Sequence, residues 1–366
     1  PLVWADAPLT LLSDYPTARC LDGSPGGYYY RPAASSSAAD KWVFSLQGGG
    51  ECTTAGDCAG RATGDLGSSA SWSDDGSSLL VQFQEDSAER NPSFYDWNHV
   101  YVMYCTGDLH LGTVETPGDN QWGWAFFSGA LIVDAVIEDL KARQGLGNAS
   151  TVVWSGDSAG GIGSAALVDH VSQALPLSRV VGAPIAGMYW NNSKPYVGPG
   201  NVSYVPFDTE AFRGYADMWQ LQLPAACTAV WTSQPWVCAL LNYSIPHLES
   251  DMFVIEFETD SVQLNLHDGV PEYNDDTAPF VLSFGRTMST VLSSVVPSLS
   301  GAQRGVYAAA CFEHTYFDAA YPFVSGENFL SAFASWLDGA ANDTLVTMDD
   351  CCSGDEVQFN PTCPSY

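Results

Sequence analysis

The chain has 366 residues, of which 46% are hydrophobic and 15% are charged. This apolar content excludes an intrinsically disordered protein, because such a chain can bury enough surface to offset its loss of conformational entropy. Acidic residues outnumber basic ones by 42 to 12, which gives a formal net charge of −30. A surface this negative repels phosphate groups, so we expect neither nucleic acid nor an anionic membrane surface as a partner.

Short β-rich apolar runs alternate along the chain with longer helical patterns. Strands are predicted at residues 42–46, 99–105, 151–155, 180–183, 252–257 and 305–311. Helices are predicted at residues 124–144, from 159 onward, and at 209–222, 277–294 and 327–337. This alternation is typical of an α/β fold with a mainly parallel sheet covered by helices.

The domain organisation follows from what the chain lacks. We find no internal repeat and no linker, so residues 1–366 are predicted to form a single domain. The stretch 185–250 differs from the rest, since it is rich in Pro and Trp and contains two cysteines and three N-x-S/T sequons. We interpret it as an insertion over the sheet that forms a lid or a pocket wall.

Ten cysteines without any C-x-x-C pair favour disulfides over a zinc or thioredoxin-type site. Cys52–Cys58 and Cys227–Cys238 are plausible local bridges, and the pairing of the other six stays open. Five glycosylation sequons begin at Asn148, Asn191, Asn201, Asn242 and Asn342. Together these features predict a secreted or luminal protein. The chain starts at Pro1, so we expect a signal peptide to have been removed, and no apolar run is long enough to span a bilayer.

A glycine-rich turn around Ser158 carries the clearest chemical signal. The predicted strand 151–155 leads into Gly156-Asp157-Ser158-Ala159-Gly160, which matches G-x-S-x-G, and a helical pattern follows. In α/β hydrolases this turn holds a nucleophilic serine in strained backbone, so the flanking residues must be small. The sequence therefore predicts an α/β-hydrolase-like fold with Ser158 as nucleophile, although a chance match in a glycine-rich turn is the alternative. We interpret Asp157 as a helix-start carboxylate favoured by the helix dipole.

A second glycine run follows the predicted strand 42–46. In esterases, backbone N–H groups of such a segment stabilise the oxyanion, and glycines let the backbone approach the substrate. We expect Gly49 or Gly50 to donate together with Ala159, the residue after the nucleophile. A flexible turn without a chemical role is the alternative.

The general base should follow the nucleophile and the acid in chain order. His314 lies just past the predicted strand 305–311, where a loop can bring an imidazole over the serine, so we predict it as the base. His267 is the second candidate. Three earlier histidines are expected to be structural: His99, His110 and His170.

Asp260 is our candidate for the acid. It ends the predicted strand that starts at Met252, and strand carboxyl ends are where open α/β sheets place their chemistry. Its role would be to hold His314 in the useful tautomer and stabilise the imidazolium. Three acids compete with it, and most of them are expected to be solvated in loops: Asp268, Asp275 and Asp276.

Seven motifs in this chain resemble, in the same order, those of the pectin acetylesterase/Notum family of secreted carboxylesterases. They lie at residues 20–28, 46–52 with Cys58, 104–108, 127–131, 156–161, 259–263 and 311–314. The resemblance covers most of the chain between about residues 18 and 316, and it implies a triad of Ser158, Asp260 and His314. It also implies oxyanion donors at Gly49, Gly50 and Ala159. Two residues that border the acyl pocket depart from the family pattern: Asp157, where a small residue is usual, and Glu51, where an aromatic residue is common.

The motifs and the resemblance predict a secreted serine carboxylesterase with no metal or cofactor. Its substrate would be an acetylated polysaccharide such as pectin, with Trp122, Trp124 and Tyr104 available to stack on sugar rings. The alternative is a longer acyl chain, as for Notum, or an aromatic or polymeric ester. A large apolar pocket would favour the longer chain, and a shallow groove would favour acetate. A catalytically inactive binding protein is disfavoured because all three triad positions are filled. The sequence does not determine the oligomeric state.

Overall fold

One mixed β-sheet organises the computed structural model, which describes residues 7–190, 194–295, 302–339 and 344–364. Within these ranges, nine strands pair in the order β1-β2-β4-β3-β5-β6-β7-β8-β9. The strands are β1 (Leu9–Leu11), β2 (Gly27–Arg31), β3 (Lys41–Leu46), β4 (Asn98–Val102), β5 (Thr151–Asp157), β6 (Arg179–Ile185), β7 (Asp251–Phe257), β8 (Arg304–Ala309) and β9 (Thr344–Met348).

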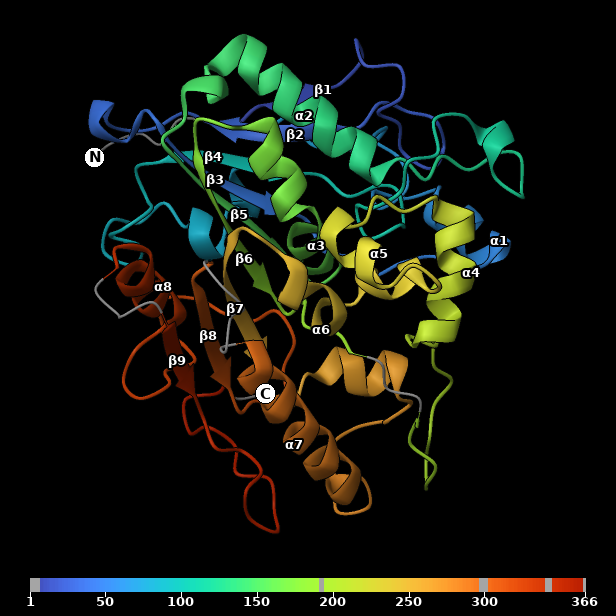
Figure 1. Cartoon of the computed structure of the whole chain (residues 1–366), viewed down its shortest axis with the longest axis vertical. Helices are drawn as coiled ribbons and strands as arrows, with labels where there is room; N and C mark the ends of the chain where they lie inside the picture. Colours follow the sequence, from blue (N-terminus) through green and yellow to red (C-terminus); the bar gives the residue numbers. More distant parts are fainter. Residues whose placement is uncertain (1–6, 191–193, 296–301, 340–343, 365–366) are drawn as a thin grey trace.

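The sheet is parallel from β4 to β9. Only the edge pairs β1–β2 and β2–β4 are antiparallel. The helices are α1 (Ala55–Arg61), α2 (Gly129–Gln144), α3 (Ala159–Ala174), α4 (Thr209–Trp219), α5 (Ala225–Val230), α6 (Leu241–Ser244), α7 (Ala278–Val295) and α8 (Phe329–Leu337). Figure 1 shows the sheet crossing the molecule from β1 at the top to β9 at the lower left, with helices around it. The predicted α/β-hydrolase-like fold is confirmed.

Both faces of the sheet are buried, because alternate residues of each strand point to opposite sides. Trp154 and Val254 belong to the core that contains α2, α3 and α7. Val153 and Phe253 belong to the core on the other face, where Phe253 packs on Phe333 of α8 with ring centroids 5.4 Å apart. Helices thus cover both faces, and the carboxyl ends of the parallel strands remain as the edge where loops can form a site.

All six predicted strands and all five predicted helices are present, with some changes at their ends. The helix predicted at 124–144 begins only at Gly129, after Ser128 at the N-cap position. Two predicted strands end early, at Val102 and Ala309. The sequence prediction missed β1, β2 and β9, which lie toward the two edges of the sheet and pair with residues distant in the chain.

All ten cysteines form disulfides. The two predicted local bridges, Cys52–Cys58 and Cys227–Cys238, are confirmed. The six cysteines whose pairing was open form Cys20–Cys105, Cys311–Cys363 and the adjacent pair Cys351–Cys352. Cys311 lies two residues after the end of β8, so its bridge ties the loop that carries His314 to the C-terminal segment.

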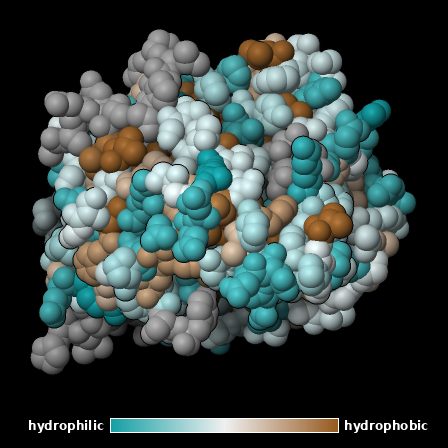
Figure 2. Space-filling view, turned by 90° about the horizontal axis from the view of Figure 1, so that it is seen from below, coloured by the Kyte–Doolittle hydropathy of each residue, from teal (hydrophilic) through white to brown (hydrophobic). Residues whose placement is uncertain are grey.

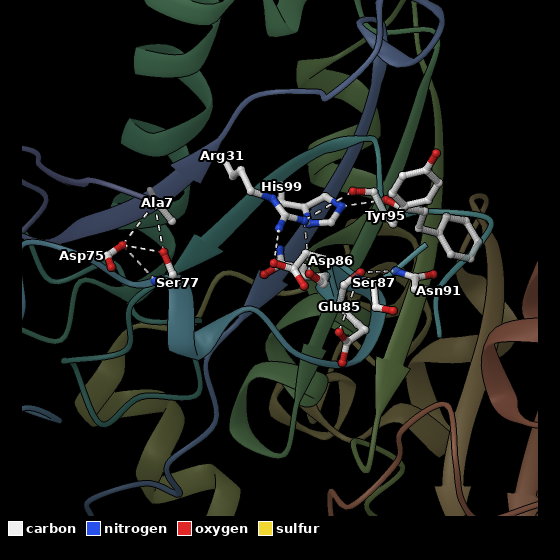
Figure 3. A network of polar contacts seen from close by, with 12 residues as sticks. Ala7, Arg31, Asp75, Ser77, Glu85, Asp86, Ser87, Asn91, Tyr95 and His99 are labelled. Atoms are coloured by element: carbon white, nitrogen blue, oxygen red, sulfur yellow. Dashed lines mark hydrogen bonds and ion pairs between the residues drawn. The ribbon is translucent and has the colours of Figure 1, made fainter. Parts of the chain in front are cut away.

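His99 of β4 is structural, as predicted. It is fully buried, with Nδ1 2.5 Å from Nη2 of Arg31 and Nε2 2.8 Å from the Phe94 carbonyl oxygen (Figure 3). Burial and the charge of Arg31 lower the pKa of His99 to about 3. The ring is therefore neutral, and we assign the proton to Nε2 because a guanidinium can only donate to Nδ1.

Residues 186–250 connect β6 to β7 and contain α4, α5 and α6. The connection begins with Ala186 at φ 48°, which turns the chain away from the sheet. Its role as a lid within a single domain stays a prediction. Among the described residues, no helix is long and apolar enough to cross a membrane.

Candidate active site

The turn between β5 and α3 presents Ser158. β5 ends at Asp157 and α3 begins at Ala159, which leaves Ser158 between them at φ 55° and ψ −121°. Its N–H donates to the Ile185 carbonyl oxygen over 2.9 Å. A Cβ at position 160 would collide with the backbone oxygen of Leu46, so this crossing requires glycine. The strained backbone and the close approach are those expected of a nucleophile turn.

His314 and Asp260 meet at the ends of neighbouring parallel strands, β8 and β7. His314 Nδ1 lies 2.6 Å from Asp260 Oδ2. The Asp260 side chain is 0% exposed and also accepts the backbone N–H groups of Val262 and Gln263 over 3.0 and 2.8 Å. His314 Nε2 has no hydrogen-bond partner among the residues that the structure describes. The carboxylate therefore fixes one ring nitrogen and leaves the other for chemistry.

A cavity of about 280 Å³ brings these loops together. Five of the six sequence-predicted site residues line it: Gly49, Gly50, Ser158, Ala159 and His314. Asp260, the sixth, lies behind His314. Figure 2 views the face toward which β8 and β9 point in Figure 1, and hydrophobic residues form separate patches there among hydrophilic ones. Among the described residues, no group of His, Cys, Asp and Glu side chains could hold a metal ion.

Arg61, at the end of α1, anchors the glycine loop, and sequence analysis missed it. Its Nη1 donates to the Gly49 carbonyl oxygen over 2.8 Å, and its Nη2 donates to the Glu51 carbonyl oxygen over 3.1 Å. Gly49 and Gly50 have positive φ values of 143° and 66°, which other residues rarely adopt. With its carbonyls held by a guanidinium, the loop keeps a fixed orientation of its N–H groups. The signal in the sequence that could have found Arg61 was a basic residue, rare in this chain, three residues after Cys58.

Tyr189 is the second residue that the sequence did not reveal. It is only 4% exposed, lines the cavity, and packs on Phe207 and His267 with ring centroids 4.7 and 5.5 Å apart. Its phenol interacts with the Ser158 side chain. Burial raises the pKa of Tyr189 well above its usual value, so the phenol is a neutral hydrogen-bonding group at the cavity wall.

The interpretation of Asp157 needs correction. No acidic residue lies in the first turn of α3, and Asp157 instead ends β5 and lines the cavity. Its carboxyl group packs against Gly48, where a Cβ would come within 2.5 Å of Asp157 Oδ2. Burial raises the pKa of Asp157 to about 6, while the positive charge of a protonated His314 opposes that rise. Asp157 therefore connects the nucleophile turn to the strand end that precedes Gly49.

The alternative histidines have other partners. His267 lines the cavity, but its Nδ1 lies 3.0 Å from the Val205 carbonyl oxygen rather than near a carboxylate. His110 Nε2 lies 2.9 Å from the Gln47 carbonyl oxygen, and His170 pairs with Asp134 over 2.6 Å. These contacts support structural roles for His110 and His170.

The competing acids differ in exposure. Asp275 and Asp276 are exposed, as expected, whereas Asp268 is buried. Asp268 is therefore the exception among these acids, most of which were expected to be solvated. Of the candidate acids, Asp260 pairs with a histidine of the cavity, His314.

Comparisons with known proteins show similarity over nearly the whole chain. Residues 4–364 match the pectinacetylesterase family. The chain is 28% identical to pectin acetylesterase 11 of Arabidopsis thaliana, covering 95% of this chain and 90% of that protein. It is 27% identical to palmitoleoyl-protein carboxylesterase NOTUM of Homo sapiens, covering 94% of this chain and 69% of that protein. The structure of the Wnt deacylase Notum from Drosophila has the same fold, with a TM-score of 0.82, 24% identity, and coverage of 98% of this chain and 100% of that one.

Proposed function

Because the chain belongs to the pectinacetylesterase family of carboxylic ester hydrolases, we propose that it is a secreted serine esterase that removes O-acetyl groups from a polysaccharide such as pectin. The relatives named pectin acetylesterases support this substrate. The observation that carries the proposal is the 2.6 Å contact between His314 and Asp260, beside the cavity that also exposes Ser158. A hydroxyl, an imidazole and a carboxylate in this arrangement constitute an acyl-transfer triad.

The proposed reaction has two halves. Ser158 Oγ attacks the ester carbonyl while His314 Nε2 takes the hydroxyl proton, and the sugar hydroxyl leaves with that proton. Water then attacks the acetyl-serine, His314 again takes and returns the proton, and acetate and free Ser158 result. Asp260 accepts the Nδ1–H of His314 throughout and stabilises the imidazolium.

Backbone N–H groups of Gly49, Gly50 and Ala159 are the proposed oxyanion donors. Support comes from their position in the cavity next to Ser158 and from the position of Ala159 as the first residue of α3. A helix N-terminus presents unpaired N–H groups and a partial positive charge. Each donor aimed at the developing oxyanion contributes about 10²–10³ in rate.

An ester with a longer acyl group is the second candidate substrate, because part of the cavity lining is apolar. Leu109, Ile162, Phe207 and Leu266 give the cavity apolar walls, and its volume of about 280 Å³ exceeds what an acetyl group fills. Several relatives are named palmitoleoyl-protein carboxylesterases. The same cavity also has polar groups, among them Glu51, Asp157 and the Tyr189 phenol, and these suit a hydroxylated leaving group better than a long chain. We therefore retain acetate as the main proposal.

Secretion is supported by the cysteines and the sequons. All ten cysteines are paired, as is usual for proteins that fold in an oxidising compartment. The sequon residues Asn148 and Asn201 are exposed and can accept a glycan. Glycosidase treatment of the protein expressed in a eukaryotic secretory host should lower its apparent mass.

The substrate proposal is tested by acetate release. Wild-type protein should release acetate from acetylated pectin and hydrolyse p-nitrophenyl acetate, and Ser158→Ala should lose both activities. Ser172→Ala, on the same helix, is the matched control and should retain them. A panel of p-nitrophenyl esters should show rates that fall beyond about butyrate. Faster hydrolysis of long-chain esters than of acetate would favour the second candidate, and equal activity in wild type and Ser158→Ala would exclude both.

A further inference from the structure

A second buried carboxyl group lies directly behind the proposed catalytic acid. Glu256 is the penultimate residue of β7, four residues before Asp260, and both side chains are fully buried. Its Oε2 accepts the N–H of Met188 over 2.8 Å, and its Oε1 accepts the N–H of Phe257 over 3.0 Å. Glu256 thus connects β7 to the start of the 186–250 segment, next to Tyr189.

The Glu256 carboxyl group also lies next to that of Asp260, close enough for each to affect the protonation of the other. An ionised carboxylate can only accept hydrogen bonds, so a bond between two carboxyl groups requires a proton on one of them. Asp260 already accepts two backbone N–H groups and faces the ring nitrogen of His314. These three contacts stabilise a negative charge on Asp260, which places the shared proton on Glu256.

The charges around Glu256 lead to the same assignment. Burial and the neighbouring Asp260 raise the pKa of Glu256 well above its usual value. The Tyr189 phenol is the titratable group that faces it from the 186–250 segment, and His314 faces it from β8 through Asp260. Tyr189 is neutral, because its own pKa is raised by burial. Of this pair of carboxyl groups, only Asp260 therefore carries a negative charge toward the imidazole, which also faces Asp157 at the cavity wall.

We propose that Glu256 is a positioning residue, which stays a neutral carboxylic acid and donates its proton in a hydrogen bond to Asp260. Because it also accepts the Met188 N–H, Glu256 holds together the acid of the triad and the backbone that leads to the cavity wall. In the reaction, a neutral Glu256 lets Asp260 stabilise the imidazolium with a single, fixed charge. This role rests on the proposed function, since it acts through His314.

Two substitutions and one matched control test the proposal. Glu256→Gln keeps a donor toward Asp260 and changes no charge if Glu256 is neutral, but its amide nitrogen cannot accept the backbone N–H that the replaced oxygen accepts. Glu256→Met keeps the length of the side chain but removes the donor. Glu258→Gln is the control, because Glu258 is also fully buried but bonds to Ser289 of α7 instead of Asp260. The readout is the pH profile of kcat/KM for p-nitrophenyl acetate, with circular dichroism and thermal unfolding as checks on folding.

The acid limb is the part of the profile where kcat/KM falls at low pH because His314 becomes protonated. In Glu256→Gln, the midpoint of this limb should stay within about 0.2 pH units of wild type, and the maximal kcat/KM should fall by about tenfold or less. In Glu256→Met, kcat/KM should fall by about 10–100-fold. Its acid limb should move to higher pH, because an Asp260 without its donor holds the imidazolium more strongly. Glu258→Gln should leave the acid limb unchanged.

The opposite results would overturn the proposal. If Glu256 were ionised, Glu256→Gln would remove a negative charge near His314 and move the acid limb to lower pH by about half a unit or more. If Glu256→Met matched Glu258→Gln in both rate and acid limb, Glu256 would have no positioning role.

Infrared spectroscopy gives a readout that does not need activity. At pH 7 the difference spectrum between wild type and Glu256→Gln should contain the carbonyl band of a protonated carboxylic acid. Absence of this band would refute the neutral state even if the Met variant failed to fold. A wild-type protein without any Ser158-dependent esterase activity would instead refute the proposed function, and the infrared result would still decide the protonation of Glu256.

Discussion

The two walls of the cavity are built in different ways. One wall consists of loops at the carboxyl ends of β3, β5, β7 and β8, whose strands are paired along most of their length. The other wall comes from the 186–250 segment, where Tyr189 and Phe207 are held mainly by ring packing, with centroids 4.7 Å apart. Ser158 and His314 lie on the first wall, and the rings that shape the cavity lie on the second.

This difference separates chemistry from selectivity. Strand pairing fixes the relative positions of Ser158 and His314 because it fixes the loops that carry them. The second wall depends on side chains of a segment that the sheet does not direct. Substitutions on the first wall should therefore change kcat, and substitutions on the second should change which acyl group is accepted.

The largest expected effect distinguishes two histidines of the cavity. His314→Ala should lower kcat by about 10³-fold or more, because the general base is lost. His267→Ala should lower kcat/KM by about tenfold or less, because His267 contacts Tyr189, Phe207 and the Val205 carbonyl of the second wall. Steady-state kinetics with p-nitrophenyl acetate measure both variants. A larger loss of activity in His267→Ala than in His314→Ala would identify His267 as the general base and contradict the division between the walls.

Arg61 tests how rigid the first wall must be. Arg61→Ala frees the carbonyl groups of Gly49 and Glu51 and should lower kcat by about 10–100-fold with little change in KM, because oxyanion donors act in the transition state. Arg90→Ala is the control, since Arg90 pairs with Glu85 and Asp318 in an exposed position. A rise in KM without a loss of kcat would show that Arg61 contributes to ground-state binding instead.

Phe207 tests the second wall. Phe207→Ala should enlarge the cavity and raise the ratio of butyrate to acetate hydrolysis by about tenfold, with a smaller effect on acetate alone. Tyr189→Phe keeps the ring and should leave this ratio near that of wild type. An unchanged ratio in Phe207→Ala would mean that the acyl group binds elsewhere in the cavity.

The smallest expected effect concerns stability on the strand side. Burial raises the pKa of Glu258 to about 8. Because this value is above that of the unfolded chain, the folded protein binds the proton more tightly, and stability falls as pH rises from about 4.5 to 8. Glu258→Gln removes this contribution. Over the same pH range, the melting temperature of the variant should therefore fall less than that of wild type, and the two falls should differ by about 2–5 °C. Parallel melting curves against pH would contradict a buried neutral Glu258.

The same division explains what the sequence could predict. Ser158 and His314 were accessible because each follows a recognisable β-strand, and a parallel sheet brings such strand ends to one edge. Arg61 was not, because its partners are the backbone carbonyl groups of Gly49 and Glu51 in another segment. Tyr189 has no local pattern either, since its packing depends on the course of residues 186–250. β9 was missed and the pairing of Cys20 with Cys105 stayed open for a related reason: each joins residues far apart in the chain.

Covalent labelling tests the central proposal most directly. A fluorophosphonate probe followed by peptide mass spectrometry should place the label on Ser158 in wild type, with none in Ser158→Ala and much slower labelling in His314→Ala, whose serine lacks its base. Labelling of a different serine, or equal labelling of wild type and Ser158→Ala, would contradict the proposed triad.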